Sequence, residues 1–333
     1  ILSSFTTDSF RSIGRPHQGV SSGRARALGG TSNLWGGQLV EFQPIDFGSR
    51  ASPAMSGWPI SYSDCAPYVR ATYERLGIDQ PAQDDSAVWR ARVGQVPEFS
   101  EGIEVFLTRW MKTPSMAVLY GQAIQDDARL EVVPDHTVVG FQADGGRITA
   151  VIAKDKDGRP VRIAGDQFVV AAGTVETVRL LLAAAADQSW DCPWAANPML
   201  GLRFQDHLGG RLGTIIPLDK RRLFESFATI YWNGHKFQPK LRVTEEVLHK
   251  SCLLGAQGIV VFESSAAEHL VFLKQFLKAA IYSRRIAGVW DFFRHAVACL
   301  RYLPPLMWTY VKEHRMFVPF DSKIVLNVQA EQL

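Results

Sequence analysis

The chain has 333 residues, of which 47% are hydrophobic and 21% are charged. This composition predicts a globular protein with an extensive core and excludes a disordered chain. Its 36 basic and 33 acidic residues are interleaved and leave a net charge of +3, so nucleic acid is not expected as a partner.

The four cysteines are far apart and form no C-x-x-C pair, which argues against a zinc site or a disulfide framework and favours a reducing compartment. No basic-then-apolar leader follows Ile1, so no signal peptide is recognised; a cytoplasmic location is favoured and export stays open. Lysines and arginines interrupt the apolar region 270–308, so a transmembrane helix is not expected.

The first 60 residues are rich in Gly, Ser and Pro and predict an extended, loop-rich segment. A helix is expected over 63–76, because Gly77 stands where a helix end favours a left-handed residue. A second helix is expected over 115–125.

Residues 130–172 predict a small antiparallel meander of short strands. Gly145-Gly146 and Asp157-Gly158 supply hairpin turns. The expected strands are 130–133, 137–142, 148–153, 161–163 and 168–172. The last of them is a continuous apolar run, which is typical of a strand buried on both faces.

Helices are expected to alternate with strands through the rest of the chain. A strong helix should cover 175–186, and a capping box at Ser265–Glu268 should begin another. A further helix is expected over 289–303, stopped by Pro304-Pro305.

The sharpest chemical motif is the glycine-rich segment 28–37, Leu-Gly-Gly-Thr-Ser-Asn-Leu-Trp-Gly-Gly. Its glycines allow close backbone approach, and its hydroxyl and N–H groups could cradle a diphosphate. A glycine-rich surface turn is the alternative interpretation. Trp35 must pack on something, for which a flavin ring and the protein core are both candidates.

Two further motifs carry weaker signals. The turn Gly173-Thr174 leads into the helix that carries Glu176, and helix N-termini with glycine at the turn bind phosphates, yet no G-x-G-x-x-G occurs in the chain. Asp206 and His207 are adjacent, but neighbours on an extended segment point in opposite directions, so a structural role is preferred.

Taken together and in this order, these segments resemble the glucose-methanol-choline oxidoreductases, and especially their bacterial, pyranose-oxidase-like branch. The matching segments are RARALGGTSNLWGG (24–37), SGWPI (56–60), QFVVAAGTVETVRLLL (167–182), NPMLGLRFQDH (197–207) and AEQ (330–332). They span nearly the whole chain.

The resemblance implies an α/β fold, with a discontinuous, Rossmann-like FAD domain and an α+β cap domain of antiparallel sheet and helices. The FAD domain is expected at 1–60 and 129–212, and the cap at 61–128 and 213–333. The implied reaction oxidises the CH–OH group of an alcohol or sugar by hydride transfer to flavin N5, with an unknown electron acceptor.

The resemblance also implies which residues meet FAD. Gly29, Gly30, Thr31, Ser32, Asn33 and Trp35 would line the flavin, and Val138 would meet the adenine side through its backbone. Gly173, Thr174 and Glu176 would approach the middle of the cofactor. Asp206 and His207 would support them.

The sequence departs from the family in three places. The family's first βαβ unit with its G-x-G-x-x-G is expected before Ile1, and its catalytic histidine after Leu333, so no residue here is assigned as catalytic and this piece alone is expected to be inactive. Leu34 stands where some members carry a flavin-linking histidine, so a covalent link there is excluded.

Two other interpretations remain. The chain could be a complete, non-catalytic binding or scaffold module of the same fold, whose basic amphipathic helices at 268–285 and 289–303 face a partner or a membrane surface. Ordinary solvation of a cap helix is the preferred explanation for those basic residues. A flavin hydroxylase is less favoured, because such enzymes do not usually combine this loop, meander and Asp-His segment.

Overall fold

A computed structural model describes residues 3–4, 13, 24–49, 56–187, 190–264, 266, 268–273, 275–276, 288–319 and 321–331. The chain divides into two compact units, each made of two segments. Unit 1 comprises Ile1–Gly36 and Thr113–Phe204, and unit 2 comprises Gly37–Lys112 and Gln205–Leu333. The first boundary lies earlier than the expected residue 60, because Gln38 and Leu39 pair with a strand of unit 2.

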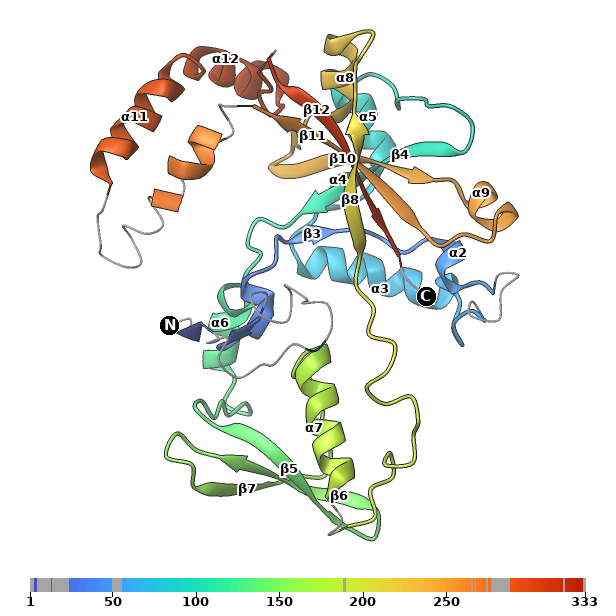
Figure 1. Ribbon diagram of the computed structural model, residues 1–333, viewed down its shortest axis with the longest axis vertical. Coiled ribbons are helices and arrows are strands. Elements are labelled where there is room, and N and C mark those ends of the chain that lie inside the picture. The colour runs from blue at the N-terminus through green and yellow to red at the C-terminus, as the bar shows by residue number, and fades with distance from the viewer. Residues whose placement is uncertain are drawn as a thin grey trace. The chain divides into compact units, whose positions relative to one another are not determined.

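Unit 1 is a three-stranded antiparallel sheet with helices (Figure 1). Its elements are β1 (Ser3–Ser4), β2 (Ala25–Arg26), η2 (Gly30–Asn33), α6 (Met116–Asp126), β5 (Thr137–Asp144), β6 (Arg147–Lys154), β7 (Pro160–Ala164) and α7 (Thr174–Ala186). Strands β5, β6 and β7 pair in chain order, and Gly145 and Gly146 form the first turn with positive φ. The expected meander is confirmed for these three strands.

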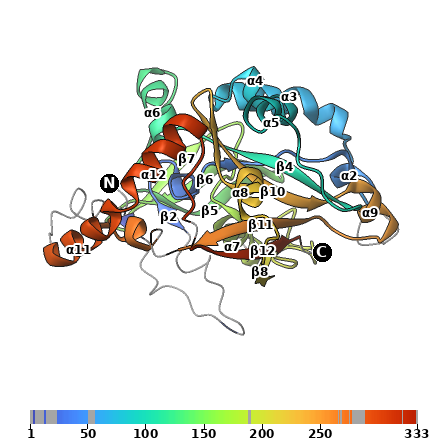
Figure 2. The same ribbon diagram turned by 90° about the horizontal axis from the view of Figure 1, so that it is seen from above.

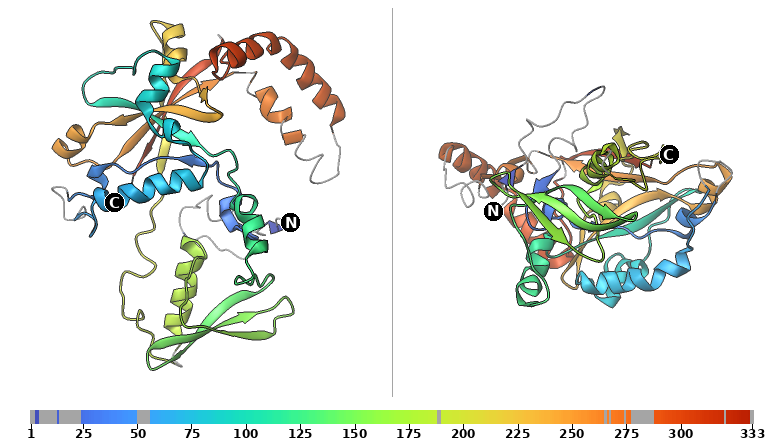
Figure 3. Two further views of the ribbon diagram at one scale, coloured as in Figure 1. Left: turned by 180° about the vertical axis from the view of Figure 1, so that it is seen from behind. Right: turned by 90° about the horizontal axis from the view of Figure 1, so that it is seen from below.

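Helix α7 packs on this sheet, as the rear view in Figure 3 shows. Phe141 of β5 is buried against Leu180 and Ala184 of α7, and Trp194 lies edge-on to Phe141. The Trp194 indole also donates a hydrogen bond to the carbonyl of Leu181, 2.9 Å away. These contacts fix the direction of α7 and therefore the place of its N-terminus.

Two expected strands of the meander were wrong. Residues 130–133 are irregular and their large side chains are exposed, because Pro134 and a left-handed Asp135 interrupt the backbone there. Residues 168–172 also form no strand: Val169 is 90% exposed, although Val170 packs on the α7 cluster. A strand needs a hydrogen-bonded neighbour, and no strand that the structure describes pairs with this run.

Unit 2 is built on a seven-stranded antiparallel sheet (Figures 1 and 2). Its strands are β3 (Gln38–Leu39), β4 (Ile103–Trp110), β8 (Leu208–Thr214), β9 (Ile230–Trp232), β10 (His235–Val243), β11 (Ala256–Glu263) and β12 (Lys323–Ala330). Six of them follow the order β3-β4-β10-β11-β12-β8, and β9 pairs with β10. Asn233 and Gly234 join β9 to β10 with positive φ at both positions, as a tight hairpin requires.

Helices cover one face of this sheet and enclose the main core (Figure 2). The helices of unit 2 are α2 (Pro44–Phe47), α3 (Tyr62–Arg75), α4 (Gln80–Gln83), α5 (Asp85–Arg92), α8 (Lys220–Phe227), α9 (Glu245–Lys250), α11 (Val289–Leu300), α12 (Leu303–Trp308) and the π-helix η3 (Thr309–Glu313). Trp89 of α5 and Phe237 of β10 are almost completely buried in this core. Alternation along β10 sends Phe237, Pro239 and Leu241 toward the helices, and Gln238 and Lys240 to the opposite face.

A buried arginine ties the helices to the sheet. The Arg109 guanidinium on β4 donates to the carbonyls of Ala82, Leu107 and Gln83 and to the Asp85 carboxylate, over 2.6–3.1 Å. Asp85 in turn accepts from the Leu107 N–H at 2.8 Å. Arg109 therefore fixes the start of α5 against the central strands.

The expected helices are confirmed with small shifts. Residues 63–76, 115–125 and 175–186 correspond to α3, α6 and α7. The helix expected over 289–303 ends at Leu300, and Pro304 and Pro305 lie in the first turn of α12 instead of stopping a helix. Proline is well tolerated there, because the first-turn N–H groups have no partner within the helix. The capping box at Ser265 lies partly outside the described residues.

The chain is thus a mixed α/β protein with antiparallel sheets and helices. Every strand pairing among the described residues is antiparallel, so they do not include the parallel pairing expected of a Rossmann-like domain. No helix in the described ranges combines the length and the apolar character needed to cross a bilayer.

Candidate functional site

The glycine loop of unit 1, residues 28–36, is held to the start of α6 by its own side chains. The Asn33 amide donates to the Leu28 carbonyl at 2.7 Å, and its oxygen accepts from the Ser115 hydroxyl at 2.7 Å and the Ala117 N–H at 3.2 Å. The Trp35 indole donates to the Pro114 carbonyl at 2.6 Å. Asn33 and Trp35 therefore have clear structural roles in this loop.

The loop also contains two hydroxyl side chains, and two glycines precede them. The Ser32 hydroxyl donates back to the Gly29 carbonyl, whereas Thr31 is exposed. Gly29 has a φ of 84°, and a Cβ there would lie 2.8 Å from the Asn33 side chain. Gly30 also has positive φ. Glycine is needed at position 29 both for the backbone conformation and for the space.

The N-terminus of α7 begins at a glycine without a side-chain cap. Gly173 is the N-cap residue with a φ of 80°, and it makes no side-chain hydrogen bond that would cap the helix. A Cβ at Gly173 would meet no atom of the described residues within 4 Å. The first-turn N–H groups, which begin at Thr174, therefore start a 13-residue helix that has no side-chain cap.

An ion-pair triad joins the segment before the glycine loop to this helix end. Arg24 Nη1 lies 3.0 Å from Glu176 Oε1, and Arg179 Nε lies 2.7 Å from Glu176 Oε2. Burial alone would raise the pKa of Glu176, but the hydrogen bonds and charges of Arg179 and Arg24 outweigh it and lower the pKa. Two motifs 152 residues apart in sequence thus meet around one carboxylate.

This triad predicts how the stability of unit 1 depends on pH. Because the folded pKa of Glu176 is below its ordinary value of 4.5, its stabilisation is present above that pH and is lost as the pH falls through the folded pKa. We expect Glu176→Gln to lower the free energy of unfolding near neutral pH and to reduce its decline toward pH ~3. Denaturant titrations at several pH values measure this.

The exposed acid Glu131 of the same unit provides a matched control. Glu131→Gln should leave the slope of stability against pH nearly unchanged. An equal change of slope in both variants would contradict the role assigned to the triad.

Val138 lies on β5 beside an irregularity in the ladder. Its side chain packs on the α7 cluster, and the β5–β6 register shifts between Val138 and Gly140. Such bulges leave backbone groups outside the ladder. The structure thus places Val138 at an irregular position, with its side chain turned to the core.

Asp206 and His207 belong to unit 2 and are described with it. The Asp206 carboxylate accepts from the backbone N–H of His207 at 2.7 Å, while the His207 ring lies 3.5 Å from Glu331. Pairing of Ala330 with Leu208 brings these segments together. The Asp206 carboxylate thus meets the backbone of His207, and the His207 ring lies beside Glu331.

Unit 2 contains a polar sheet face that sequence reasoning missed. The Gln38 amide donates to the Thr108 hydroxyl at 2.6 Å and to Gln238 at 2.9 Å, and Thr108 is completely buried. Farther along the sheet, Lys240 Nζ lies 3.4 Å from the Gln257 amide oxygen. Lys240 is only 4% exposed, and burial lowers its pKa.

A sequence signal for this face existed. In β10, Lys236, Gln238, Lys240 and Arg242 alternate with residues of the opposite face, including buried Phe237, which is the pattern of a sheet with one polar side. The sequence analysis did not predict a strand over 235–243, so this alternation was not recognised.

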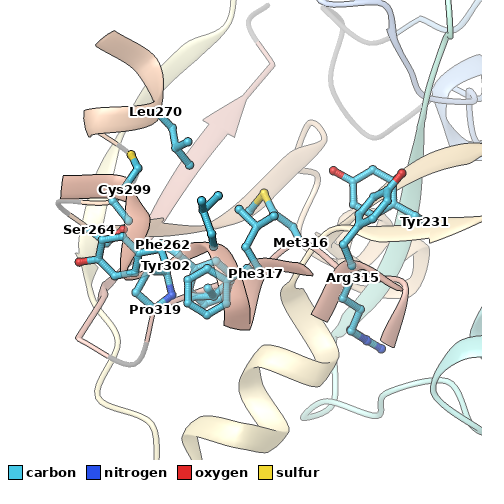
Figure 4. A pocket seen from close by; sticks show the side chains of 15 residues that line it. Tyr231, Phe262, Ser264, Leu270, Cys299, Tyr302, Arg315, Met316, Phe317 and Pro319 are labelled. Atoms are coloured by element: carbon cyan, nitrogen blue, oxygen red, sulfur yellow. The ribbon is translucent and has the colours of Figure 1, made fainter. Parts of the chain in front are cut away.

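A separate pocket of about 230 Å³ lies between the sheet of unit 2 and its C-terminal helices (Figure 4). Phe262, Met316 and Phe317 line it, while the Arg315 guanidinium points away (Figure 4) and lies 3.5 Å from the Phe224 carbonyl. The walls are largely apolar. This pocket lacks the converging polar groups expected of a catalytic site.

Comparison with protein-family models finds no matching family, and comparison with curated proteins finds no matching sequence. Across the part of the chain that the structure describes, no cluster of three or more His, Cys, Asp or Glu residues is arranged to hold a metal ion.

Proposed function

We propose that the chain is part of an FAD-dependent oxidoreductase of the glucose-methanol-choline type that acts on CH–OH groups of alcohols or sugars. The observation that carries the proposal is the Arg24–Glu176 contact, which joins the segment just before the glycine loop to the N-terminus of α7. These are the two segments to which the resemblance assigns the cofactor.

The residues around α7 fit a negatively charged group. The uncapped helix end offers backbone N–H groups, and no described atom lies close to the Cβ position of Gly173. Such ends favour diphosphates. The triad of Arg24, Arg179 and Glu176 carries a net positive charge. Gly173, Thr174 and Val138 would hold the dinucleotide through backbone groups.

The glycine loop fits the cofactor mainly through its backbone. The polar side-chain atoms of Ser32, Asn33 and Trp35 make hydrogen bonds within the protein, so these residues would hold the loop in shape. Gly29, Gly30 and Thr31 would then contact the flavin. The chemistry that bound FAD supplies is acceptance of a hydride from the CH–OH carbon. We assign none of these residues to proton removal.

The polar sheet face of unit 2 suits the proposed substrate class. Gln38, Gln238 and Gln257 present amide groups on one side of the sheet, and the buried side chains of Thr108 and Lys240 hydrogen-bond Gln38 and Gln257 from within it. Such groups can hydrogen-bond the several hydroxyls of a sugar or polyol. Asp206 and His207, beside Glu331, would then support the cap rather than take part in the reaction.

The Rossmann-like part of the fold remains a proposal. It would make residues 168–172 a strand paired in parallel with neighbours, whereas the described residues show this run unpaired and Val169 exposed. The glycine turn at Gly173 that leads into α7 is what supports this assignment.

FAD titration of the purified chain, followed by flavin fluorescence, tests the proposal. We expect saturable binding, weakened about tenfold by Arg24→Ala, because a charge-assisted contact at the site is removed. Arg129→Ala is the matched control, since Arg129 is also paired with a carboxylate in unit 1. Equal loss in both variants, or no saturable binding by the wild type, would contradict the assignment.

A further inference from the structure

Helices α11 and α12 and the π-helix η3, residues 289–313, form an arm that leads away from the sheet of unit 2 (Figure 1). The inner side of α11 is already packed. His295 stacks on Phe272 with ring centroids 4.0 Å apart, and Phe292 lies 4.8 Å from Phe276. Cys299, one turn after His295, is buried.

The outer side of the arm carries a second apolar stripe. Val289, Phe293, Val297 and Leu300 recur at helical spacing and are all exposed, with Val297 at 64%. The stripe continues with Leu303, Met307 and Val311, which are also exposed. Nothing within the described part of the chain covers these side chains, so their apolar surface is available to a partner.

Two tryptophans stand on this outer surface. Trp290 is 87% exposed and Trp308 is 61% exposed, whereas Trp89 of the core is 1% exposed. Tryptophan is enriched where protein meets the boundary between water and lipid, because its ring is largely apolar and its N–H is polar.

Positive charge accompanies the stripe. Arg294 and Arg301 follow Trp290 and Val297 at one-turn spacing. The arm itself, residues 289–313, contains three Lys or Arg and two Asp or Glu, and Arg294 pairs with Asp291 at 3.2 Å. In the sequence just before it, residues 268–288 contain four Lys or Arg and one Glu, so the segment 268–313 carries +4 while the whole chain carries +3. The rest of the chain is therefore net negative, and the basic character is concentrated in and beside the arm.

We propose that this arm docks the protein on an anionic phospholipid surface, with the stripe from Val289 to Val311 buried at the headgroup boundary. An exposed apolar stripe with tryptophans and flanking arginines fits a helix lying in the plane of such an interface. The charge favours anionic lipid over a second copy of the arm, because two copies would bring like charges together. This inference is independent of the proposed flavin chemistry.

Co-sedimentation with vesicles tests the proposal on the whole chain. The wild type should bind vesicles of phosphatidylcholine with phosphatidylglycerol, and should not bind phosphatidylcholine alone. Binding should weaken as salt rises from about 0.1 M to about 1 M, because the screening length falls from ~10 Å to ~3 Å. Absence of binding at low salt, or equal binding to both vesicle types, would overturn it.

Variants locate the contact. Trp290→Ser with Phe293→Ser should reduce partition onto anionic vesicles about a hundredfold, because each well-buried aromatic contributes about tenfold. Arg294→Glu with Arg301→Glu should also reduce it. Leu212→Ser is the control, since Leu212 is an exposed apolar residue on β8 of the same unit. Sedimentation velocity adds a second readout: a dimer that the serine variants dissociate, without vesicle binding, would assign the stripe to a second copy and overturn the proposal.

Discussion

Arg109→Met should lower the free energy of unfolding of unit 2 by about 3–5 kcal/mol, the cost usually found when one partner of a buried charged network is removed. The substitution keeps much of the side-chain volume but leaves the carbonyls of Ala82 and Gln83 and the carboxylate of Asp85 without this donor. Urea denaturation followed by circular dichroism measures the loss.

Arg242→Met is the control for this effect. Arg242 lies on the neighbouring strand β10 and pairs with Glu104 at 2.6 Å, but the pair is partly exposed. Partly exposed pairs contribute at most about 1 kcal/mol. Similar losses in the two variants would mean that the network around Arg109 does not hold α4 and α5 in the way its geometry indicates.

Trp89→Ala should have a comparable effect for a different reason. Trp89 is 1% exposed and packs in the core between α5 and the sheet, and truncating such a residue typically costs about 3–5 kcal/mol through lost burial and the cavity left behind. The same denaturation experiment measures it.

Trp290→Ala removes the same side chain from the outer surface of the arm. Because Trp290 is 87% exposed, stability should change by less than about 0.5 kcal/mol, while vesicle binding falls. A large destabilisation by Trp290→Ala would show that this residue has a packing partner and would weaken the proposal for the arm.

Local periodicity and turn chemistry predicted most of unit 1. The hairpin at Gly145-Gly146 and the helix that follows Gly173 depend on neighbouring residues, and both are found. The strand predicted over 168–172 was wrong, because an apolar run does not by itself provide the hydrogen-bonded neighbour that a strand requires. The prediction that Pro304 and Pro305 stop a helix was wrong, because proline occurs both after the end and in the first turn of helices. The sequence alone does not distinguish the two cases.

The candidate site was predictable as motifs but not as contacts. The family resemblance assigned Gly29, Asn33, Trp35 and Glu176 to the cofactor, but the sequence did not indicate that the Ser115 hydroxyl would donate to Asn33 or that Arg24 and Arg179 would share Glu176. Contacts between residues far apart in the chain depend on packing, which a single sequence does not display. The polar face around Lys240 was missed for the same reason, although the alternation along β10 was readable.

Hydrogen–deuterium exchange of the chain with and without FAD tests the central claim most directly, because it reports backbone amides one segment at a time. We predict slower exchange on FAD addition in residues 28–36 and at the start of α7, from Thr174 to Thr177, with little change in β5–β7 beyond Val138. Unchanged exchange in both segments at saturating FAD, or protection confined to unit 2, would contradict the assignment of the glycine loop and the α7 N-terminus to the cofactor.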